Sequence, residues 1–207
     1  MKYFIWFFLV VFVSCQKNAE QKTDDKTVVG IQAYSGFPKN KTKLVAKAID
    51  SFYHVRTVIL PEKKLYAQAF VHIKSPRYRA DSLIYIEKRN LPDSLDYSIG
   101  LTDKDISTTK KANGKMLEPA SRYKDWGIMG LGFCPGKSCV VSTFRIKHKN
   151  QQVHLERLKK VAVHEFGHNL GLPHCPDKKC VMTDAVESIK TIDNAQLALC
   201  SNCQRTL

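Results

Sequence analysis

Hydrophobic and polar positions alternate along the chain in patterns that predict strands and helices in turn. Residues 28–34 (VVGIQAY) are rich in β-forming side chains, and residues 42–55 place apolar side chains along one helical face. A second strand is predicted over residues 57–60, ended by Pro61. The order strand, helix, strand indicates an α/β fold.

The same alternation continues through the middle of the chain. Residues 79–88 predict another helix, and residues 97–101 (YSIGL) another strand. Two further apolar or β-branched runs, residues 127–134 and 140–146, are joined by the sequence PGKS, which has hairpin chemistry. We therefore expect a pair of strands there.

A long helix is predicted over residues 151–170, where apolar side chains recur at near-helical intervals. Asn150 precedes it and suits the N-cap position. With 207 residues, 43% of them hydrophobic and 25% charged, the composition is that of an ordinary globular protein. We expect one domain over residues 28–207, with no internal repeat or linker.

The start of the chain has a different pattern. Residues 3–13 form an apolar run that is too short to span a bilayer but fits the core of a signal peptide. The ending FVSC resembles a bacterial lipobox, in which the cysteine, here Cys15, is lipidated; an ordinary secretory signal is the alternative. We expect residues 1–14 to be a lipoprotein signal peptide and residues 15–27 a flexible tether. The mature chain would then be exported and lipid-anchored to a bacterial membrane, in the periplasm or at the cell surface.

The formal charge of +14 is strongly basic for a chain of this size. Its lysines are scattered in ones and twos, without interleaved aromatic residues or a recognisable nucleic-acid-binding module. We therefore expect no specific nucleic-acid partner, but a solvated basic surface with some attraction to anionic membranes or acidic peptides. A basic surface protein that binds nucleic acid or lipid is a rival hypothesis, and it predicts steep salt dependence of binding.

The strongest chemical signal begins inside the predicted long helix. His164 and His168 lie four residues apart, so both imidazoles face one point and both can bind one Zn²⁺. Glu165, about 100° further round the helix, can contact a water bound to that metal and act as general base. Gly171 follows where the helix must stop and reverse, and His174 returns as a third ligand. Three protein ligands leave one position for water, as in catalytic zinc sites.

The extended pattern H-E-x-x-H-x-x-G-x-x-H is the metzincin signature. It predicts a zinc-dependent peptidase that hydrolyses peptide bonds by a zinc-bound water, with a peptide or protein as substrate. The alternative is a catalytically idle, zinc-stabilised binding or scaffold lipoprotein. Glu165 disfavours that alternative, because a purely structural zinc site needs no such carboxylate.

Four cysteines and a methionine follow the third histidine at distinctive spacings. Four residues separate the first two cysteines, and the methionine comes two residues after the second cysteine. Seventeen residues then lie between the methionine and the final pair of cysteines. The residues are Cys175, Cys180, Met182, Cys200 and Cys203. The string from His164 to Cys203 resembles the archaemetzincin motif, and residues 101–106 and 140–145 look like family segments upstream.

The resemblance to archaemetzincins implies both a fold and a second metal. It implies a metzincin-like catalytic domain with a mixed, mostly parallel sheet, an active-site helix and a second packing helix. The four cysteines would hold a structural zinc in a C-terminal four-cysteine subsite, giving two Zn²⁺ per chain. Met182 would form the methionine turn beneath the catalytic zinc. The resemblance also implies an aminopeptidase-like preference for short peptides, as in some members of the family.

Export would expose the cysteines to oxidation, which leaves their state open. Three local disulfides are conceivable besides zinc binding. For the four motif cysteines we favour zinc, because the short C-terminal tail gains stability directly from a metal. For the pair beside the predicted hairpin turn we favour a disulfide or free thiols. The three conceivable pairs are Cys134 with Cys139, Cys175 with Cys180, and Cys200 with Cys203.

Overall fold

The structure is a computed structural model that describes residues 26–184 and 188–207. The predicted signal peptide, Cys15 and nearly all of the predicted tether lie outside the described residues. Within the described ranges, no helix combines the length and the apolar character needed to cross a membrane.

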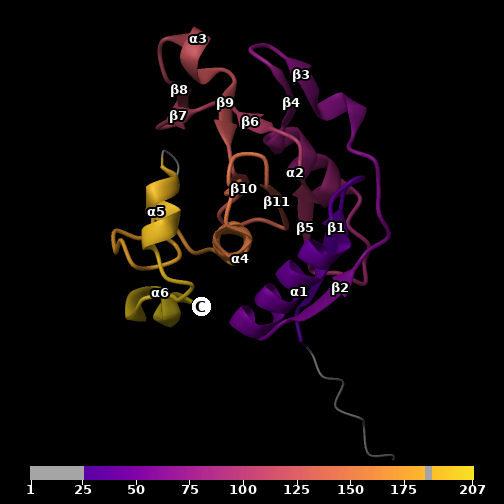
Figure 1. The fold of residues 1–207 in the computed structure, drawn as a ribbon, viewed down its shortest axis with the longest axis vertical. Coiled ribbons are helices and arrows are strands. Elements are labelled where there is room, and N and C mark those ends of the chain that lie inside the picture. Colours follow the sequence, from indigo (N-terminus) through magenta and orange to yellow (C-terminus); the bar gives the residue numbers. More distant parts are fainter. Residues whose placement is uncertain (1–25, 185–187) are drawn as a thin grey trace, which may run out of the picture.

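The centre of the fold is a five-stranded sheet with the strand order β10-β11-β5-β1-β2 (Figure 1). Four strands run parallel, and only the edge strand β10 is antiparallel, to β11. The predicted mixed, mostly parallel sheet is therefore confirmed. The strands are β1 (Val28–Ala33), β2 (Arg56–Ile59), β5 (Tyr97–Thr102), β10 (Gly130–Gly132) and β11 (Ser138–Ser142).

Helices cover both faces of this sheet, which is why its central strands are buried on both sides. Helices α1 (Lys39–Tyr53) and α4 (Gln151–Asn169) pack on one face, and α2 (Ala80–Arg89) packs on the other. Successive residues of β11 show the alternation, because Cys139 contacts the core of the first face and Val140 that of the second. The predicted helices are thus present, and together with the sheet between them they form three layers.

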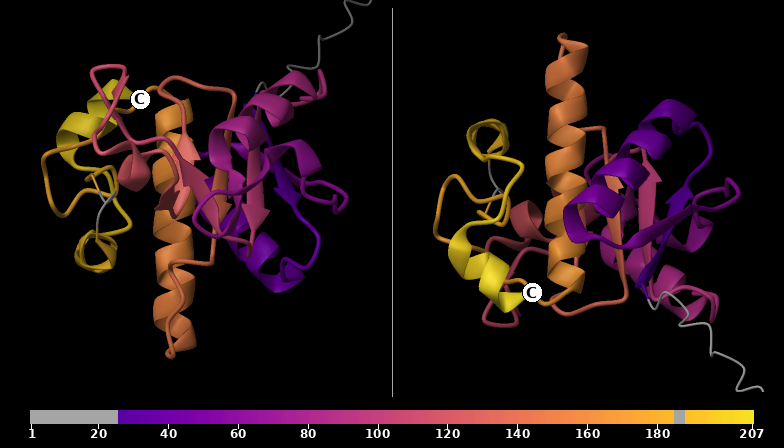
Figure 2. Two further views of the ribbon diagram at one scale, coloured as in Figure 1. Left: turned by 90° about the horizontal axis from the view of Figure 1, so that it is seen from above. Right: turned by 90° about the horizontal axis from the view of Figure 1, so that it is seen from below.

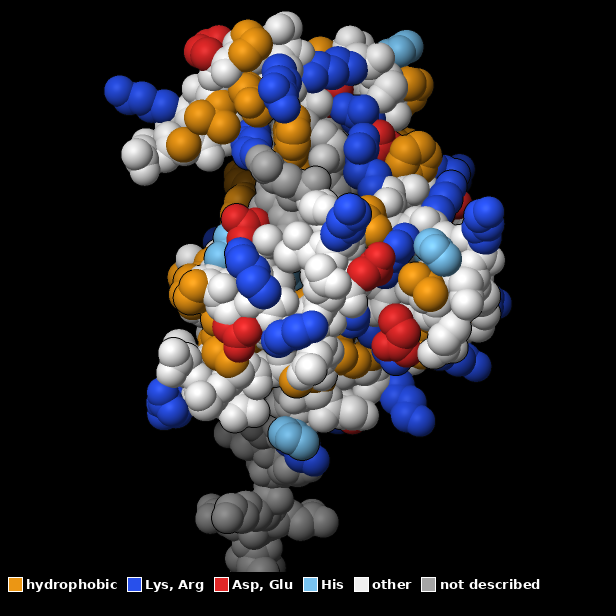
Figure 3. Space-filling view, turned by 60° about the vertical axis from the view of Figure 1, so that its left-hand side comes forward, with side chains coloured by type: hydrophobic (Ala, Val, Ile, Leu, Met, Phe, Trp, Pro, Cys, Tyr) orange, Lys and Arg blue, Asp and Glu red, His pale blue; other side chains and the backbone are white. Residues whose placement is uncertain are grey.

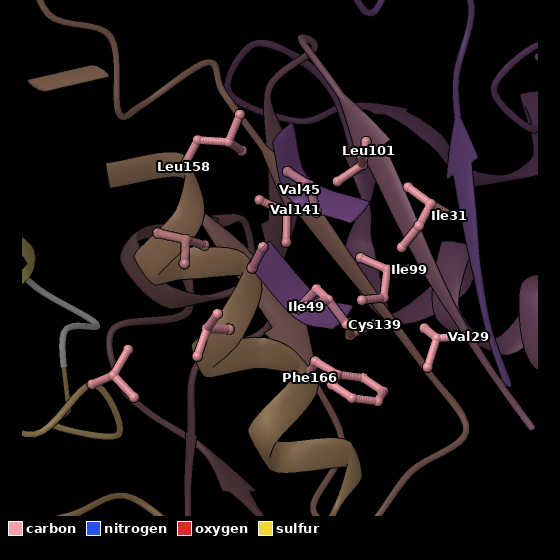
Figure 4. Packing of buried hydrophobic residues seen from close by; sticks show 14 of the residues in the cluster. Val29, Ile31, Val45, Ile49, Ile99, Leu101, Cys139, Val141, Leu158 and Phe166 are labelled. Carbon is pink, nitrogen blue, oxygen red and sulfur yellow. The ribbon is translucent and has the colours of Figure 1, made fainter. Parts of the chain in front are cut away.

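The larger core lies between the sheet and the helix pair α1 and α4. Figure 4 shows side chains from both helices meeting side chains of the parallel strands. The labelled contacts include Val45 and Ile49 of α1, Leu158 and Phe166 of α4, and Ile31, Ile99 and Leu101 of the sheet. The catalytic helix predicted from the sequence is therefore also a main element of the core.

Helix α4 begins and ends close to the predicted positions. The Asn150 side chain accepts hydrogen bonds from the backbone N–H groups of Gln152 and Val153, so it is the N-cap. The helix runs between the sheet on one side and the C-terminal segment, residues 170–184 and 188–207, on the other (Figure 2). That segment contains the short helices α5 (Ile189–Asn194) and α6 (Ser201–Thr206).

A second, four-stranded sheet with the order β3-β4-β6-β9 lies beside the main one, and no sequence pattern predicted it. Its strands are β3 (Phe70–His72), β4 (Pro76–Arg79), β6 (Ile106–Thr108) and β9 (Trp126–Ile128). The remaining short elements are η1 (Ala67–Ala69), the hairpin of β7 (Lys111–Ala112) and β8 (Lys115–Met116), and α3 (Ala120–Tyr123).

The second sheet corrects the strand pair predicted for residues 127–134 and 140–146. The first run is divided at Met129, because β9 pairs with β6 in the small sheet and β10 pairs with β11 in the main sheet. The second run ends at Ser142, because the chain turns there to bring Arg145 to the buried carboxylate of Asp105. Only β10 and β11 form the expected hairpin.

Candidate active site

The three predicted histidine ligands converge at the C-terminal half of α4. His164 and His168 lie on the helix and His174 on the loop that follows, and their nearest ligand atoms all lie within 4.8 Å of one another. The Nε2 atoms of His164 and His168 are 3.0 Å apart. Two zinc-bound nitrogens in a tetrahedral site would lie about 3.3 Å apart, given Zn–N bonds of about 2.0–2.1 Å. The spacing therefore fits a zinc ion.

Backbone carbonyls set the tautomers of the two helical histidines. The Nδ1 atom of His164 lies 2.8 Å from the Val181 carbonyl oxygen, and that of His168 lies 2.7 Å from the Leu172 carbonyl oxygen. Because a carbonyl oxygen only accepts, each Nδ1 carries the hydrogen and each Nε2 presents a lone pair. Two lone pairs this close repel one another unless a cation lies between them.

Burial keeps both imidazoles in the neutral form that a metal requires. Burial and the neighbouring His168 ring lower the pKa of His164 to about 3. The pKa of His168 is also lowered, chiefly by burial. Neutral imidazoles with free Nε2 atoms are the usual zinc ligands in proteins.

The turn after α4 brings His174 back toward the helix. Gly171 has a φ of +96°, a left-handed conformation that side chains with a Cβ rarely adopt. Its N–H bonds to the His168 carbonyl, and the N–H of Leu172 bonds to the Gly167 carbonyl. The chain therefore reverses within one turn, as the sequence predicted.

Glu165 is buried beneath the edge strand β10 and lines the same cleft as the histidines. A Cβ at Gly130 would lie 2.6 Å from the Glu165 Cγ atom, so only glycine leaves room for this side chain. Burial raises the pKa of Glu165 to about 8, against the opposing effect of a hydrogen bond from the Gly132 N–H. The sequence reasoning missed both glycines, because it took the run GIMGLG only as a strand.

The active-site cleft has a volume of about 500 Å³. Strand β10 and the residues before it form one wall, α4 forms the floor, and α5 with the loop after Met182 forms the opposite wall. Figure 3 shows this side of the molecule hollowed between its upper and lower parts, with basic side chains on both sides. The cleft is open along its length, so it can accept an extended peptide.

The four motif cysteines also come together, next to the histidine cluster. The Sγ atoms of Cys175 and Cys200 are 3.6 Å apart, and those of Cys180 and Cys203 are 3.8 Å apart. A disulfide bond would need about 2.05 Å. Four thiolates around zinc would lie about 3.8 Å apart, given Zn–S bonds of about 2.3 Å. The arrangement fits a closed tetrahedral zinc site, and all four cysteines are free, so neither of the two local disulfides considered for these residues is formed.

The backbone around the cysteine cluster favours the thiolate form at one position. Hydrogen bonding from the Cys203 backbone N–H, with contributions from the other thiols, lowers the pKa of Cys200 to about 7. Two further cysteines among the described residues are also free: Cys134 is exposed, whereas Cys139 is buried on β11. The proposed disulfide between them is absent, and the free-thiol alternative describes them.

Met182 lies where the helix and the cysteine loop meet. It is fully buried, its carbonyl oxygen accepts a hydrogen bond from the Cys175 N–H, and its side chain packs against α4 at Gly167. The residue thus contacts the helix between the two histidine ligands, which is where a methionine turn is expected.

Comparisons with known proteins agree with this arrangement. The family model described as "Peptidase family M54" matches residues 120–207. An archaemetzincin from Halobacterium salinarum is 27% identical over 188 residues, covering 86% of this chain and 98% of the relative. An archaemetzincin from Methanopyrus kandleri is 31% identical over 119 residues, covering 58% of this chain and 59% of the relative.

Solved structures share the fold along almost the whole chain. The archaemetzincin of Archaeoglobus fulgidus, complexed with malonate, aligns with a TM-score of 0.68 at 24% identity, covering 87% of this chain and all of that one. The structure of the Methanopyrus kandleri archaemetzincin gives 0.70 at 24% identity, covering 89% and 97%. The predicted fold class is therefore confirmed. On the family model over residues 120–207, the nearly full-length relatives and the two residue clusters, the chain is an archaemetzincin-like zinc metallopeptidase, similar to the members of peptidase family M54.

Proposed function

We propose that the protein hydrolyses peptide bonds with Glu165 as general base and His164, His168 and His174 as ligands of a catalytic zinc. The observation that carries the proposal is the convergence of three imidazoles beside a buried carboxylate in one cleft. Zinc held there would polarise a peptide carbonyl and acidify a water molecule.

Glu165 has the features required to move a proton in this cleft. The Gly132 N–H and the close approach of Gly130 hold its carboxylate in one position. Its buried environment makes the protonated form accessible near neutral pH, which suits a group that first takes a proton and then delivers it. We propose that it takes the proton of the attacking water and transfers it to the leaving amine.

The variant E165Q tests this role. It should lower kcat/KM by roughly 100- to 10,000-fold, because glutamine fills the same space but cannot accept a proton. The measurement is a peptide-library digest by the zinc-loaded protein, with zinc content determined in parallel. Peptides with free and acetylated amino termini measure the aminopeptidase-like preference that the resemblance implies. E156Q, at a more exposed glutamate of the same helix, is the control.

Two outcomes of that digest would contradict the proposal. Full activity in E165Q would exclude Glu165 as the base. Stoichiometric zinc in the wild type without cleavage of any peptide would favour the idle, zinc-stabilised scaffold instead.

We further propose that Cys175, Cys180, Cys200 and Cys203 hold a second, structural zinc, so that each chain binds two. The spacing of their sulfur atoms supports this count. Native mass spectrometry should give two zinc ions for the wild type and fewer for C203S, whereas C134S, at an exposed cysteine outside the cluster, should keep both. Equal metal content in wild type and C203S would overturn the assignment.

We also propose that the protein is exported and anchored to a bacterial membrane through Cys15. The support is the sequence of residues 1–15 alone. In a bacterial host the wild type should fractionate with membranes and C15S should not. Retention of C15S in the membrane fraction would contradict lipidation at that residue.

A further inference from the structure

The charged side chains of the cleft are mostly basic. Among the described residues that line it, the lysines are Lys110, Lys111 and Lys160, and the carboxylates are Glu165 and Asp184. Glu165 is reserved for proton transfer in the proposed mechanism, and Asp184 lies beside His174, 3.9 Å from its Nδ1 atom. A peptide in the cleft therefore meets positive charge from one wall, at Lys110 and Lys111, and from the floor, at Lys160.

Lys160 is the basic residue nearest the proposed reaction centre along α4. It lies four residues before His164, so it is on the same face of the helix and roughly 6 Å further along the axis. A side chain bound at Lys160 would thus belong to a residue close to the cleaved bond.

The Lys160 ammonium is held in place by backbone groups rather than by a carboxylate. Its Nζ donates to the carbonyl oxygens of Ile192 at 2.9 Å and Asp193 at 3.4 Å. The Asp193 carboxylate is bound by Arg157, with two contacts of 2.7 Å. An ammonium has three N–H donors, so these two carbonyls leave one for another acceptor.

The lining of the cleft also contains apolar side chains. They include Ile192, whose carbonyl oxygen accepts from Lys160, and Val161, Val181 and Ala195. Apolar side chains together with a cation fit a substrate side chain that has a hydrocarbon stem and a terminal carboxylate. In such surroundings a charged hydrogen bond contributes more than it does in water.

We propose that the cleft selects peptides with a glutamate or aspartate next to the cleaved bond, and that Lys160 is the specificity-determining residue that binds this carboxylate. The inference rests on the proposed peptidase function. Lys111 is exposed on the wall that contains β10 and the residues before it. Its charge adds to the positive field and strengthens the same preference.

The wild-type enzyme provides the first test. Matched peptides carry Glu, Gln or Lys at each position that flanks the cleaved bond, and kcat/KM is measured for each. The Glu peptide should exceed the Gln peptide roughly tenfold or more at one position, since a charged hydrogen bond is replaced by a neutral one. A ratio near one at every position overturns the inference. Absence of any cleavage would instead count against the proposed function.

Variants of Lys160 provide the second test. K160M should bring the Glu-to-Gln ratio to about one, K160R should retain the preference, and K160E should favour the Lys peptide. K159M is the matched control, because it removes the same charge from the neighbouring position, which pairs with Glu156 and does not line the cleft.

The Glu-to-Gln ratio of kcat/KM is measured within each variant, so a partial loss of folded protein lowers both values equally and leaves the ratio unchanged. Zinc content and thermal unfolding are recorded for each. If Lys160 serves only to hold α5, K160M will lower stability while keeping the wild-type ratio, and that result overturns the inference.

Discussion

Gly171 shows how one residue joins backbone geometry to metal binding. Its positive φ turns the chain so that His174 faces the two histidines of α4. An alanine there would be strained in the native turn, although nothing lies within 4 Å of the position of the added Cβ. The strain therefore acts on the backbone that carries His174 and not on packing.

We expect G171A to lower both the free energy of unfolding and the affinity for the catalytic zinc. The backbone cost is on the order of 1–2 kcal/mol. G36A is the control, because Gly36 has a similar φ of +89° and similarly open surroundings but leads to no metal ligand. Both variants should lose stability, and only G171A should lose zinc in a chelator competition. Equal zinc affinity in the two variants would show that the turn does not position His174.

At this scale the two residue clusters could be predicted because their geometry is local. His164 and His168 are one helical turn apart, and the cysteines follow at short intervals. The groups that position Glu165 could not be predicted in the same way. Gly130 and Gly132 lie far from it in sequence and meet it only because β10 is the edge strand above α4.

Among the elements, α2 carries an ionisable group into the core. Glu87 is buried against the sheet, where the Tyr34 hydroxyl donates to it at 2.5 Å and the Ser98 hydroxyl at 3.1 Å. Burial raises the pKa of Glu87 from 4.5 to about 7, although both hydrogen bonds and Lys63 oppose that change. The folded protein therefore holds this proton more tightly than the unfolded chain does.

This difference predicts a pH dependence of stability. Stability from the protonated Glu87 is fully present below about pH 4.5 and is lost as the pH rises to about 7, by up to about 3 kcal/mol. E87Q has no proton to lose, so its free energy of unfolding should rise relative to the wild type across this range. Urea denaturation with zinc present measures the difference at each pH, and E62Q, at an exposed glutamate, controls for the lost charge.

A difference between wild type and E87Q that stays constant from pH 4.5 to 7 would contradict this account. Loss of zinc at the acid end affects both proteins, so it cancels in the comparison.

The periodicity of apolar residues predicted which long helices and strands exist. It did not predict which strands the short strands pair with. The helix over residues 151–170 has enough turns to show its apolar face and its N-cap. Residues 127–134 look like one strand because the division at Met129 depends on two different neighbours, β6 and β11. Pairing of this kind is a tertiary property, and a single short run does not contain it.

In the molecule as a whole, the C-terminal segment would depend on the proposed structural zinc more than the sheet does. Its helices have six residues each, and much of the remainder is loop. Cys175, Cys180 and Cys203 belong to the main core, so a metal that links them joins this segment to α4. The parallel sheet is buried by helices on both faces and needs no such link.

We therefore expect C203S to loosen the C-terminal segment selectively. Hydrogen exchange followed by mass spectrometry should show faster exchange in α6 and residues 170–184, with β5 and β11 unchanged. C134S should match the wild type throughout. A uniform increase over the whole chain would instead mean that the metal and the sheet form one cooperative unit.

At the scale of the whole molecule, the resemblance to archaemetzincins predicted the sheet and its packing helices. It did not predict the walls of the cleft. The mixed parallel sheet and its packing helices agree with the archaemetzincin structures. The small sheet supports the wall formed by β10 and the residues before it, and it brings together strands from three separate parts of the chain. No periodic pattern in the sequence marks that assembly.

The continuous burial of residues 161–169 in α4 limits how this enzyme can diversify. Most side chains beside the two histidines on that stretch also pack in the core, so a substitution there alters folding and the site together. Lys160 lies just outside the stretch, and the two walls belong to other elements. Residues of the two walls can therefore determine which peptides bind without belonging to the buried stretch of α4.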